Sequence, residues 1–396
     1  MDPFHNGHIY HINKIKEMYP DSILVLVLNG YFLERGEISL LTKENKTKIA
    51  LDYGVNIVLE LPFIYGTQSA DTFANMSIKL LNKLNVNKIV FGSECADITL
   101  LEKLADKQLE PEFGKLVKFY LDEGSNYPTA LAKATNIDFE YNPNDLLGIS
   151  YIKAIKENNY NIKPICIKRT NDYHDLDSNE EIISASNIRN KLKLNENINK
   201  YLPNEVIDNL IKVNKDMYFK LLKSKIITDD NLNDYLDVDE GIEYRLKKNI
   251  IISNNMDEFI EKVKTKRYTY NKLNRMFIHI LIGLKKSDNY IDDKYLRIIG
   301  FDNIGRNYLQ KIDYIASLKN TKVYDYELKA SLIYDLINNT NTYEFEIKNK
   351  PVIPLLVIFL IHLFLLNFCI WISVNNIFDI IITTSLYYTS RHNKNL

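Results

Sequence analysis

The sequence predicts an α/β fold of the doubly wound type over roughly the first 190 residues, followed by a mainly helical region. Two observations carry this prediction. Four short apolar runs, typical of strands buried in a parallel sheet, alternate with helical patterns in the first part. From about Asn199 the pattern turns helical, with few glycines and no clear strands. Such alternation places a ligand at the carboxyl ends of the strands.

The expected elements follow one another in chain order. The apolar runs predict strands over residues 22–28, 55–59, 88–91 and 163–167. Helical periodicity is found between them, over about residues 7–19, 42–53, 69–84 and 144–158. At 396 residues the chain is long enough for two domains and a sizeable core. We expect a first domain over residues 1–195, a second over residues 196–350, and a tail over residues 351–396.

An H-x-G-H pattern, His5-Asn6-Gly7-His8, stands five residues into the chain. The chemistry of nucleotidyl transfer explains its spacing. Two imidazoles can donate hydrogen bonds to phosphate oxygens that gain negative charge, and a glycine between them lets the backbone approach. The following residues look helical, so His8 would lie in a first turn whose free N–H groups favour phosphate. His11 lies three residues further on the same face. A chance His-rich terminus is the alternative on the tetrapeptide alone.

A candidate motif follows each expected strand. These motifs are Asn29-Gly30, Leu61-Pro62, Gly92-Ser93 and Lys168-Arg169. Because the carboxyl ends of parallel strands share one edge of a sheet, we expect the motifs to gather around one ligand site.

The segment Asp2-Pro3-Phe4-His5-Asn6-Gly7-His8 resembles the N-P-F-H-N-G-H box of the bacterial tRNA(Met) cytidine acetate ligases, which are H-x-G-H nucleotidyltransferases. Further matches to this family follow in order, over residues 29–37, 43, 59–63, 68–74, 91–94, 143–151, 167–169, 173–175, 183–189, 275–281, 295–297, 300–301 and 305–306. The resemblance runs from about residue 2 to about residue 352. It implies a Rossmann-like nucleotidyltransferase domain followed by a helical, tRNA-binding domain.

The resemblance also implies a reaction in two steps. Acetate attacks the α-phosphate of ATP and gives acetyl-adenylate and pyrophosphate. The N4 amine of the wobble cytidine of elongator tRNA(Met) then takes the acetyl group. ATP is thus a substrate, with Mg²⁺ expected to accompany it and no metal site on the protein. Three scattered cysteines, Cys95, Cys166 and Cys369, suggest neither a disulfide framework nor a metal cluster, which fits a cytoplasmic enzyme.

By this resemblance, His5 and His8 are the catalytic residues. They would bind the phosphates of ATP as negative charge builds in the transition state. Gly7 and His11 would contact ATP beside them.

The other ATP contacts implied by the family lie further along the chain. Ser186 and Arg189 resemble the second signature of the superfamily, in which the arginine would grip the β- and γ-phosphates. Gly92, Asn144 and Arg169 match the remaining contacts. Each of these three residues could instead be structural: a plain turn, a helix N-cap and a surface ion pair.

Residues 241–320 contain 16 Lys and Arg against 9 Asp and Glu, with Tyr268, Tyr270, Tyr290 and Tyr295 among them. Basic residues mixed with aromatic ones suit a nucleic-acid backbone, although a Lys-rich helical surface is often only solvated. The predicted tRNA contacts are Arg35, Lys43, Lys264, Lys266, Arg267 and Arg297.

The contacts of Arg35 and Lys43 are open to other interpretations. Their loop could meet ATP phosphates, or only a carboxylate such as Glu37. Glu34 stands where the family has Gln and adds a negative charge there.

Both ends of the chain depart from the family. Relatives carry a strand, roughly G-I-I-A-E-Y, before the first box, and by resemblance it is the central one. The sequence begins at Met1, so this strand is expected to be absent and its neighbours to keep unpaired ladder groups. A misassigned start codon, a damaged gene or a truncated chain would explain the difference.

The second departure is the tail. Residues 351–378 contain no Asp, Glu, Lys or Arg over 28 positions, whereas about 20 apolar residues suffice to span a bilayer. A membrane anchor, a frameshift product and a buried core helix are the open alternatives.

Two rival functions are open alternatives. Another H-x-G-H adenylyltransferase, acting on a small molecule such as a phosphopantetheine, is usually much shorter and lacks the basic helical half. A non-catalytic RNA-binding remnant of a damaged gene would have kept the motifs and lost the first strand.

Overall fold

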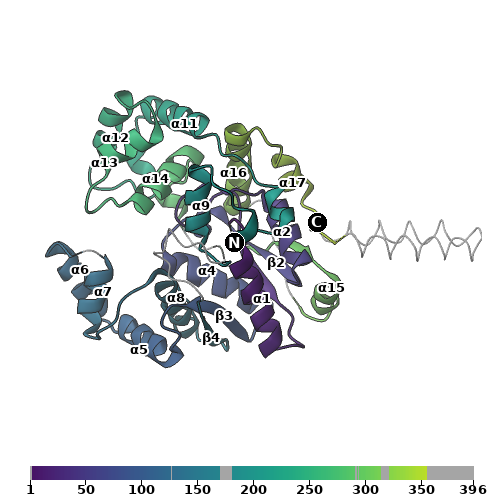
Figure 1. Ribbon diagram of the computed structural model, residues 1–396. Coiled ribbons are helices and arrows are strands. Elements are labelled where there is room, and N and C mark those ends of the chain that lie inside the picture. Colours follow the sequence, from purple (N-terminus) through teal and green to yellow (C-terminus); the bar gives the residue numbers. More distant parts are fainter. Residues whose placement is uncertain are drawn as a thin grey trace, which may run out of the picture. The chain divides into compact units, whose positions relative to one another are not determined.

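The computed structural model describes residues 2–125, 127–169, 181–289, 292, 294–313 and 321–354. The chain divides into two compact units, Met1–Val352 and Ile353–Leu396. The first unit contains all the helices and strands of the described residues (Figure 1). Most of the tail, like Tyr173, His174, Asp175 and Tyr290, lies outside the described residues.

The four predicted strands are confirmed, as two parallel pairs. Strand β1 (Val25–Asn29) pairs with β2 (Ile57–Leu61), from Val25 opposite Ile57 to Asn29 opposite Leu61. Strand β3 (Lys88–Ser93) pairs with β4 (Lys163–Lys168). The apolar run of β2 is buried at every position, as expected for a strand covered on both faces.

The predicted helices between the strands are also confirmed, as α1 (Asn6–Met18), α2 (Lys43–Asp52), α4 (Ala70–Lys83) and α8 (Pro143–Glu157). Four further helices lie between β2 and α8, namely α3 (Phe63–Gly66), α5 (Ile98–Leu109), α6 (Phe113–Asp122) and α7 (Tyr127–Thr135). Helices α5 to α8 share a small core with β3, built around Phe91, Leu101 and Ile152.

Strands β1 and β3 are not paired with each other within the described residues. The two pairs belong to separate sheets, ordered β1-β2-β5 and β3-β4. A cavity of about 610 Å³ lies between them, lined by residues 22–25 on one side and 87–90 on the other. Because β1 has no strand partner on this side within the described residues, most of its apolar side chains are only half-buried.

The prediction of no strand after Asn199 is wrong. Strand β5 (Ile298–Phe301) pairs antiparallel with β2, with a register shift between Val58 and Leu59. A side chain at Gly300 would lie 2.4 Å from the methyl group of Thr47, so glycine permits this close packing. The strand was missed because a run of four residues is too short to show a period.

Helices make up the rest of the unit. They are α9 (Ala185–Lys193), η1 (Asn199–Tyr201), α10 (Asn204–Ile207), α11 (Lys215–Thr228), η2 (Leu232–Asp234), α12 (Ile242–Ile251), α13 (Met256–Val263), α14 (Tyr270–Ile282), η3 (Lys286–Asp288), α15 (Asn303–Leu309), α16 (Lys322–Asn338) and α17 (Tyr343–Lys348). Helices α11 to α14 gather into one group, at the upper left of Figure 1.

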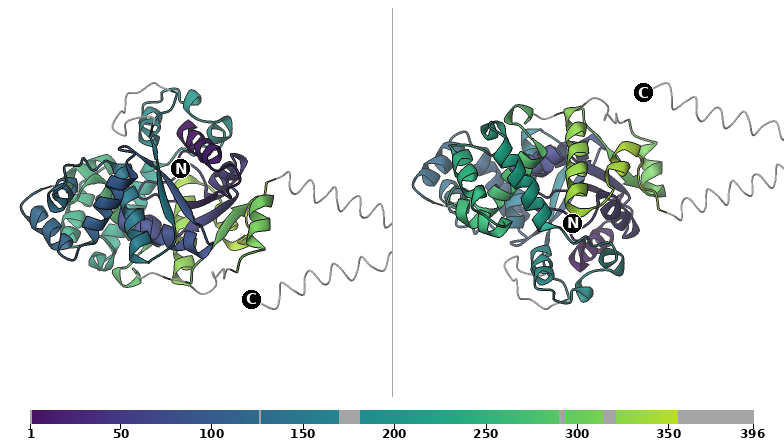
Figure 2. Two further views of the ribbon diagram at one scale, coloured as in Figure 1. Left: turned by 90° about the horizontal axis from the view of Figure 1, so that it is seen from below. Right: turned by 90° about the horizontal axis from the view of Figure 1, so that it is seen from above.

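The two halves of the unit share their largest core. It contains both Leu59 of β2 and Phe277 of α14. Both views in Figure 2 show the region of α9 beside α1, where the side chain of Asn6 donates to the carbonyl of Lys200. The domain boundary near residue 195 stays a prediction. No helix within the described residues combines the length and the apolar character needed to cross a membrane, and the anchor suggested for residues 351–378 stays untested.

Candidate active site

His5 and His8 cap the amino end of α1 for each other. The N–H of Gly7 donates to Nδ1 of His5 over 3.0 Å, and the N–H of His5 donates to Nδ1 of His8 over 3.1 Å. The His5 side chain thus satisfies an N–H of the first turn that would otherwise lack a partner. Because each Nδ1 is an acceptor, the proton of each neutral ring lies on Nε2. The cap therefore fixes both imidazoles as Nε2–H donors.

The imidazoles of this region are held neutral. Burial lowers the pKa of His5 to about 3. Burial also lowers the pKa of His8 well below its usual range, and the neighbouring His5 adds to this effect. The ring centroids of His5 and His8 lie only 4.0 Å apart, so two positive charges would repel each other strongly. At neutral pH the pair donates hydrogen bonds without carrying charge.

One pocket collects most of the predicted ATP contacts. Its volume is about 360 Å³, and it lies beside α1, between the amino end of β1 and the carboxyl ends of β3 and β4. Seven of the predicted residues line it: His5, Gly7, His8, His11, Gly92, Asn144 and Arg169. It reaches the carboxyl ends of β3 and β4, where a doubly wound sheet binds ligands, whereas Asn29-Gly30 and Leu61-Pro62 do not line it.

Arg169 lies over Gly92 at this pocket. Gly92 is the fifth residue of β3, so it is not a plain turn. A Cβ atom at Gly92 would lie 3.4 Å from Cγ of Arg169, which shows how closely the arginine stem crosses the backbone. Nε of Arg169 is buried and has no hydrogen-bond partner within the described residues. A buried donor of this kind suits a ligand that accepts from it.

A polar residue that the sequence reasoning did not assign, Glu94, lies behind two of the lining residues. Its carboxylate accepts from Nδ2 of Asn144 over 2.5 Å and lies 3.8 Å from Nε of Arg169. Glu94 lies in the segment 91–94 that matches the family, and this match could have marked it as a residue of the site. Asn144 is not an N-cap, because α8 starts at Pro143 after the cap Asn142.

Comparisons with known proteins show the family of the chain. Residues 1–350 match the HIGH nucleotidyl transferase family. The chain is 37% identical over 366 residues to the tRNA(Met) cytidine acetate ligase of Caldicellulosiruptor saccharolyticus, covering 85% of this chain and 92% of the relative. The chain belongs to the tRNA(Met) cytidine acetate ligase family. It is therefore an enzyme of the ligase class, as predicted.

Other members of the family support the same assignment. The tRNA(Met) cytidine acetate ligase of Mycoplasma mobile is 39% identical over 292 residues, covering 72% of this chain and 97% of the relative. The crystal structure of Thermotoga maritima TmcAL bound with alpha-thio ATP has a TM-score of 0.77 and 25% identity. That match covers 89% of this chain and 97% of the other. The predicted Rossmann-like nucleotidyltransferase fold is confirmed.

Two predicted ATP contacts, Ser186 and Arg189, are not among the residues that line this pocket. Helix α9 begins after the cap Ser184, so Ser186 lies in its first turn. The guanidinium of Arg189 contacts Asp2 over 2.5 Å and lies 3.6 Å from Glu37. Contact of Ser186 and Arg189 with phosphates stays a prediction.

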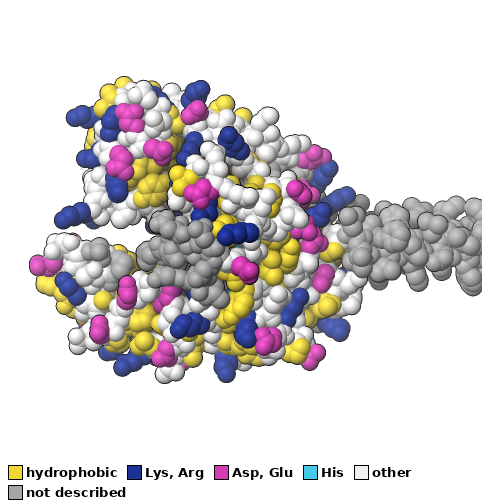
Figure 3. All heavy atoms as spheres, viewed as in Figure 1, with side chains coloured by type: hydrophobic (Ala, Val, Ile, Leu, Met, Phe, Trp, Pro, Cys, Tyr) yellow, Lys and Arg dark blue, Asp and Glu magenta, His cyan; other side chains and the backbone are white. Residues whose placement is uncertain are grey.

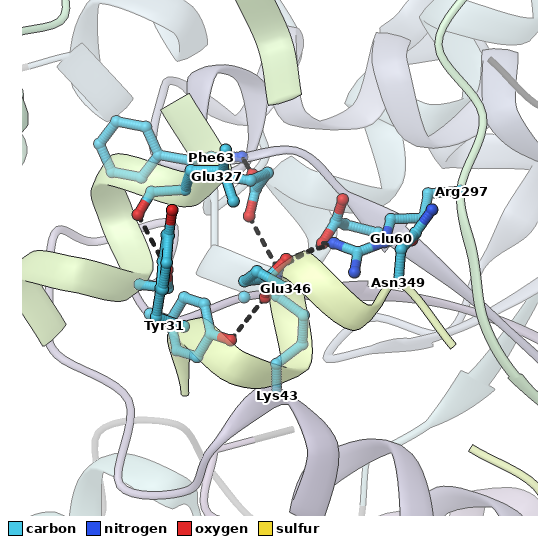
Figure 4. A network of polar contacts seen from close by, with 12 residues as sticks. Tyr31, Lys43, Glu60, Phe63, Arg297, Glu327, Glu346 and Asn349 are labelled. Atoms are coloured by element: carbon cyan, nitrogen blue, oxygen red, sulfur yellow. Dashed lines mark hydrogen bonds and ion pairs between the residues drawn. The ribbon is translucent and has the colours of Figure 1, made fainter. Parts of the chain in front are cut away.

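The prediction that Lys43 and Arg297 contact tRNA is wrong, because both are buried (Figure 4). The side chain of Lys43 is 0% exposed and pairs with Glu327 and Glu346, each over 2.8 Å, and also with Glu60. Arg297 is 2% exposed and pairs with Glu60 over 3.1 Å and with Glu346. Buried charges require such partners, and the sequence could not show that these three carboxylates converge.

The remaining predicted tRNA contacts lie at the surface or near it. Lys264 and Lys266 are exposed between α13 and α14. Arg267 beside them is exposed and pairs with Glu240. Arg35 is partly exposed and lies 3.9 Å from Glu34.

The aromatic part of the RNA prediction needs correction. Tyr268 and Tyr295 are buried in the core, whereas Tyr270 is 43% exposed. The hydroxyl of Tyr295 donates to the buried carboxylate of Glu60. Of the four interleaved tyrosines, Tyr270 is thus the one that the described residues leave available to RNA.

Proposed function

We propose that the chain activates acetate with ATP and transfers the acetyl group to N4 of the wobble cytidine of elongator tRNA(Met). The observation that supports this most directly is the pair of capped imidazoles, His5 and His8, in a pocket with Gly92, Asn144 and Arg169. The named relatives carry this activity in their names, and a similar solved structure holds alpha-thio ATP.

In the first step, an oxygen of acetate attacks the α-phosphorus of ATP. A new P–O bond forms, the bond to the bridging oxygen of the β-phosphate breaks, and pyrophosphate leaves with the electron pair. Negative charge builds on the oxygens around the α-phosphorus. His5 and His8 donate to them through Nε2–H, and Arg169 adds a positive charge. Because both imidazoles are neutral and pre-oriented, this step needs positioning and no proton transfer from them.

In the second step, the N4 amine of cytidine attacks the acetyl carbon of the adenylate. AMP leaves with the electron pair of the broken bond, and the amine loses a proton. The activated species is the adenylate itself, so the reaction needs no acyl-enzyme nucleophile. Acetate as the acyl donor belongs to this proposal.

Mg²⁺ would accompany the phosphates of ATP. Within the described residues no group of three or more His, Cys, Asp or Glu could hold a metal ion.

For the tRNA, we propose contacts from the exposed Lys264, Lys266 and Arg267, with Arg35 as a further contact. In Figure 3, Lys and Arg side chains over α11 to α14 are mixed with Asp and Glu. Contact with RNA would therefore depend on local clusters, because the face drawn there is not uniformly positive. Cys95 and Cys166 are free thiols, which suits a cytoplasmic enzyme.

The test follows exchange of labelled pyrophosphate into ATP with and without acetate. Acetate-dependent exchange is the expected result, because adenylate formation is reversible. Exchange that requires a phosphopantetheine or nicotinamide mononucleotide in place of acetate would favour the rival adenylyltransferase. Failure to bind ATP at all would favour the non-catalytic remnant.

A further inference from the structure

Two carboxylates join the loop after β3 to the start of α8. Asp145 accepts from the hydroxyl of Ser93 over 2.5 Å, and from the N–H groups of Glu94 over 3.0 Å and Cys95 over 3.2 Å. In return, the carboxylate of Glu94 accepts from the N–H of Asp145 over 3.0 Å. Glu94 thus caps α8 from another part of the chain, since the side chain of the cap residue Asn142 makes no such bond.

Glu94 has a second set of partners, which lie in the pocket. One carboxylate oxygen accepts from Nδ2 of Asn144 over 2.5 Å, and the same oxygen lies 3.8 Å from Nε of Arg169. A separation of this length is too long for a hydrogen bond, so the carboxylate of Glu94 orients the guanidinium of Arg169 through charge alone. Asn144 and Arg169 line the pocket, whereas Glu94 lies behind them.

The chemistry of these partners requires a carboxylate. Two donors, Nδ2 of Asn144 and the N–H of Asp145, hydrogen-bond to this side chain, and the positive guanidinium of Arg169 lies beside it. A carboxylate has only acceptors on both oxygens, whereas an amide would turn an NH₂ group toward one of the donors. The side chain of Glu94 is 12% exposed, so water can replace these contacts only in part.

Arg169 keeps one donor unused in this arrangement. Its Nε is buried without a hydrogen-bond partner in the described chain, although Glu94 lies beside it. Such an unsatisfied donor is costly unless a ligand completes it. The carboxylate therefore holds Arg169 in place without using up the donor that a phosphate or ribose oxygen would take.

We propose that Glu94 is a positioning residue of the nucleotide pocket, which holds the amide of Asn144 and the guanidinium of Arg169 ready for ATP. This inference rests on the proposed function, in which Asn144 and Arg169 contact ATP. Glu94 itself acts through these two residues and does not need to touch the nucleotide.

The experiment measures ATP binding by calorimetry and the KM values of adenylation for the full chain and its variants. Glu94→Ala is expected to raise the Kd and the KM for ATP about tenfold, equivalent to about 1.4 kcal/mol, with an unchanged KM for acetate. Glu94→Gln should show the same direction, since it keeps the size and loses the second acceptor. Glu110→Ala is the matched control, because Glu110 is exposed and pairs only with Lys107 in the described chain.

A double-mutant cycle separates positioning from a merely structural role. In the Asn144→Ala, Arg169→Ala background, Glu94→Ala should change the Kd for ATP less than about twofold, because its partners are gone. An equally large loss in that background would overturn the proposal, as would an unchanged Kd in the parent background. Thermal denaturation shows whether Glu94→Ala is folded. If it is not, the Kd values for ATP are compared with Glu94→Gln in the same two backgrounds.

The acetate reaction and the positioning role of Glu94 can be refuted separately. Wild-type protein that binds ATP but shows no acetate-dependent exchange would refute the acetate reaction, while the Kd values still decide the role of Glu94. Wild-type protein that does not bind ATP would refute both.

Discussion

Lys43→Met tests the buried ion cluster of Figure 4. The change keeps the length of the side chain nearly constant and removes the ammonium group that Glu60, Glu327 and Glu346 share. Removing one partner of a buried ion pair costs about 3–5 kcal/mol, because the remaining charge is left without compensation.

Two features place the expected loss of unfolding free energy near the lower end of this range. Arg297 still pairs with Glu60 and Glu346. Burial already raises the pKa of Glu327 to about 7, so this carboxyl can take up a proton once Lys43 is gone. We expect the free energy of unfolding to fall by about 3 kcal/mol, roughly 150-fold in the folding equilibrium.

The loss should depend on pH. Glu327 has a folded pKa above its ordinary value, so the folded state binds more protons between about pH 4.5 and 7, and stability falls as the pH rises through this window. Without the positive charge of Lys43 the pKa of Glu327 rises further, so the pH window in which stability falls extends to higher pH. The destabilisation by Lys43→Met should therefore be larger at pH 8 than at pH 6.

Urea denaturation followed by circular dichroism measures this free energy. Lys48→Met is the control, because Lys48 is exposed on the same helix and should change stability by less than about 0.5 kcal/mol. Unchanged stability of Lys43→Met together with weaker tRNA binding would refute the reasoning, since it would place Lys43 at an RNA-contacting surface.

Three further predictions concern the site and the surface. His8→Ala should cut the rate of adenylation much more than ATP affinity, because its donation matters most in the transition state; a normal rate in rapid-quench assays would contradict this role. Burial lowers the pKa of His5 to about 3, so the unfolded chain binds more protons between about pH 3 and 6.5, and stability falls as the pH falls through this range. His5→Gln should flatten that slope in urea titrations at pH 5 and 7, and an unchanged slope would place the proton uptake elsewhere. Lys264→Glu with Lys266→Glu should weaken tRNA binding and flatten its salt dependence while acetyl-adenylate formation persists; unchanged affinity would make this surface merely solvated.

Local patterns in the sequence were sufficient for the core of the fold. Strand β2 was predicted from a continuous apolar run, and helix α4 from helical periodicity over its whole length. Strand β5 was missed because it has four residues, and its position is set by pairing with a strand some 240 residues earlier. Such pairing depends on tertiary contacts that no local window contains.

The site residues, like the strands, could be predicted only where a local pattern marks them. His5 and His8 were found from the H-x-G-H pattern and Gly92 from the family resemblance, and their places at a helix start and a strand end bring them to one pocket. The spacing of His5 and His8 is also that of a capping box, so their mutual cap could have been predicted. Lys43 and Arg297 were misassigned because their exposure depends on carboxylates far away in the chain.

The measurement that tests the central claim most directly is mass spectrometry of elongator tRNA(Met) after incubation with the protein, ATP and isotopically labelled acetate. The account predicts that the label appears as one acetyl group on the wobble cytidine, with AMP and pyrophosphate formed in step with it. Labelled acetyl groups at other positions, or turnover of ATP without any acetylated cytidine, would contradict the account.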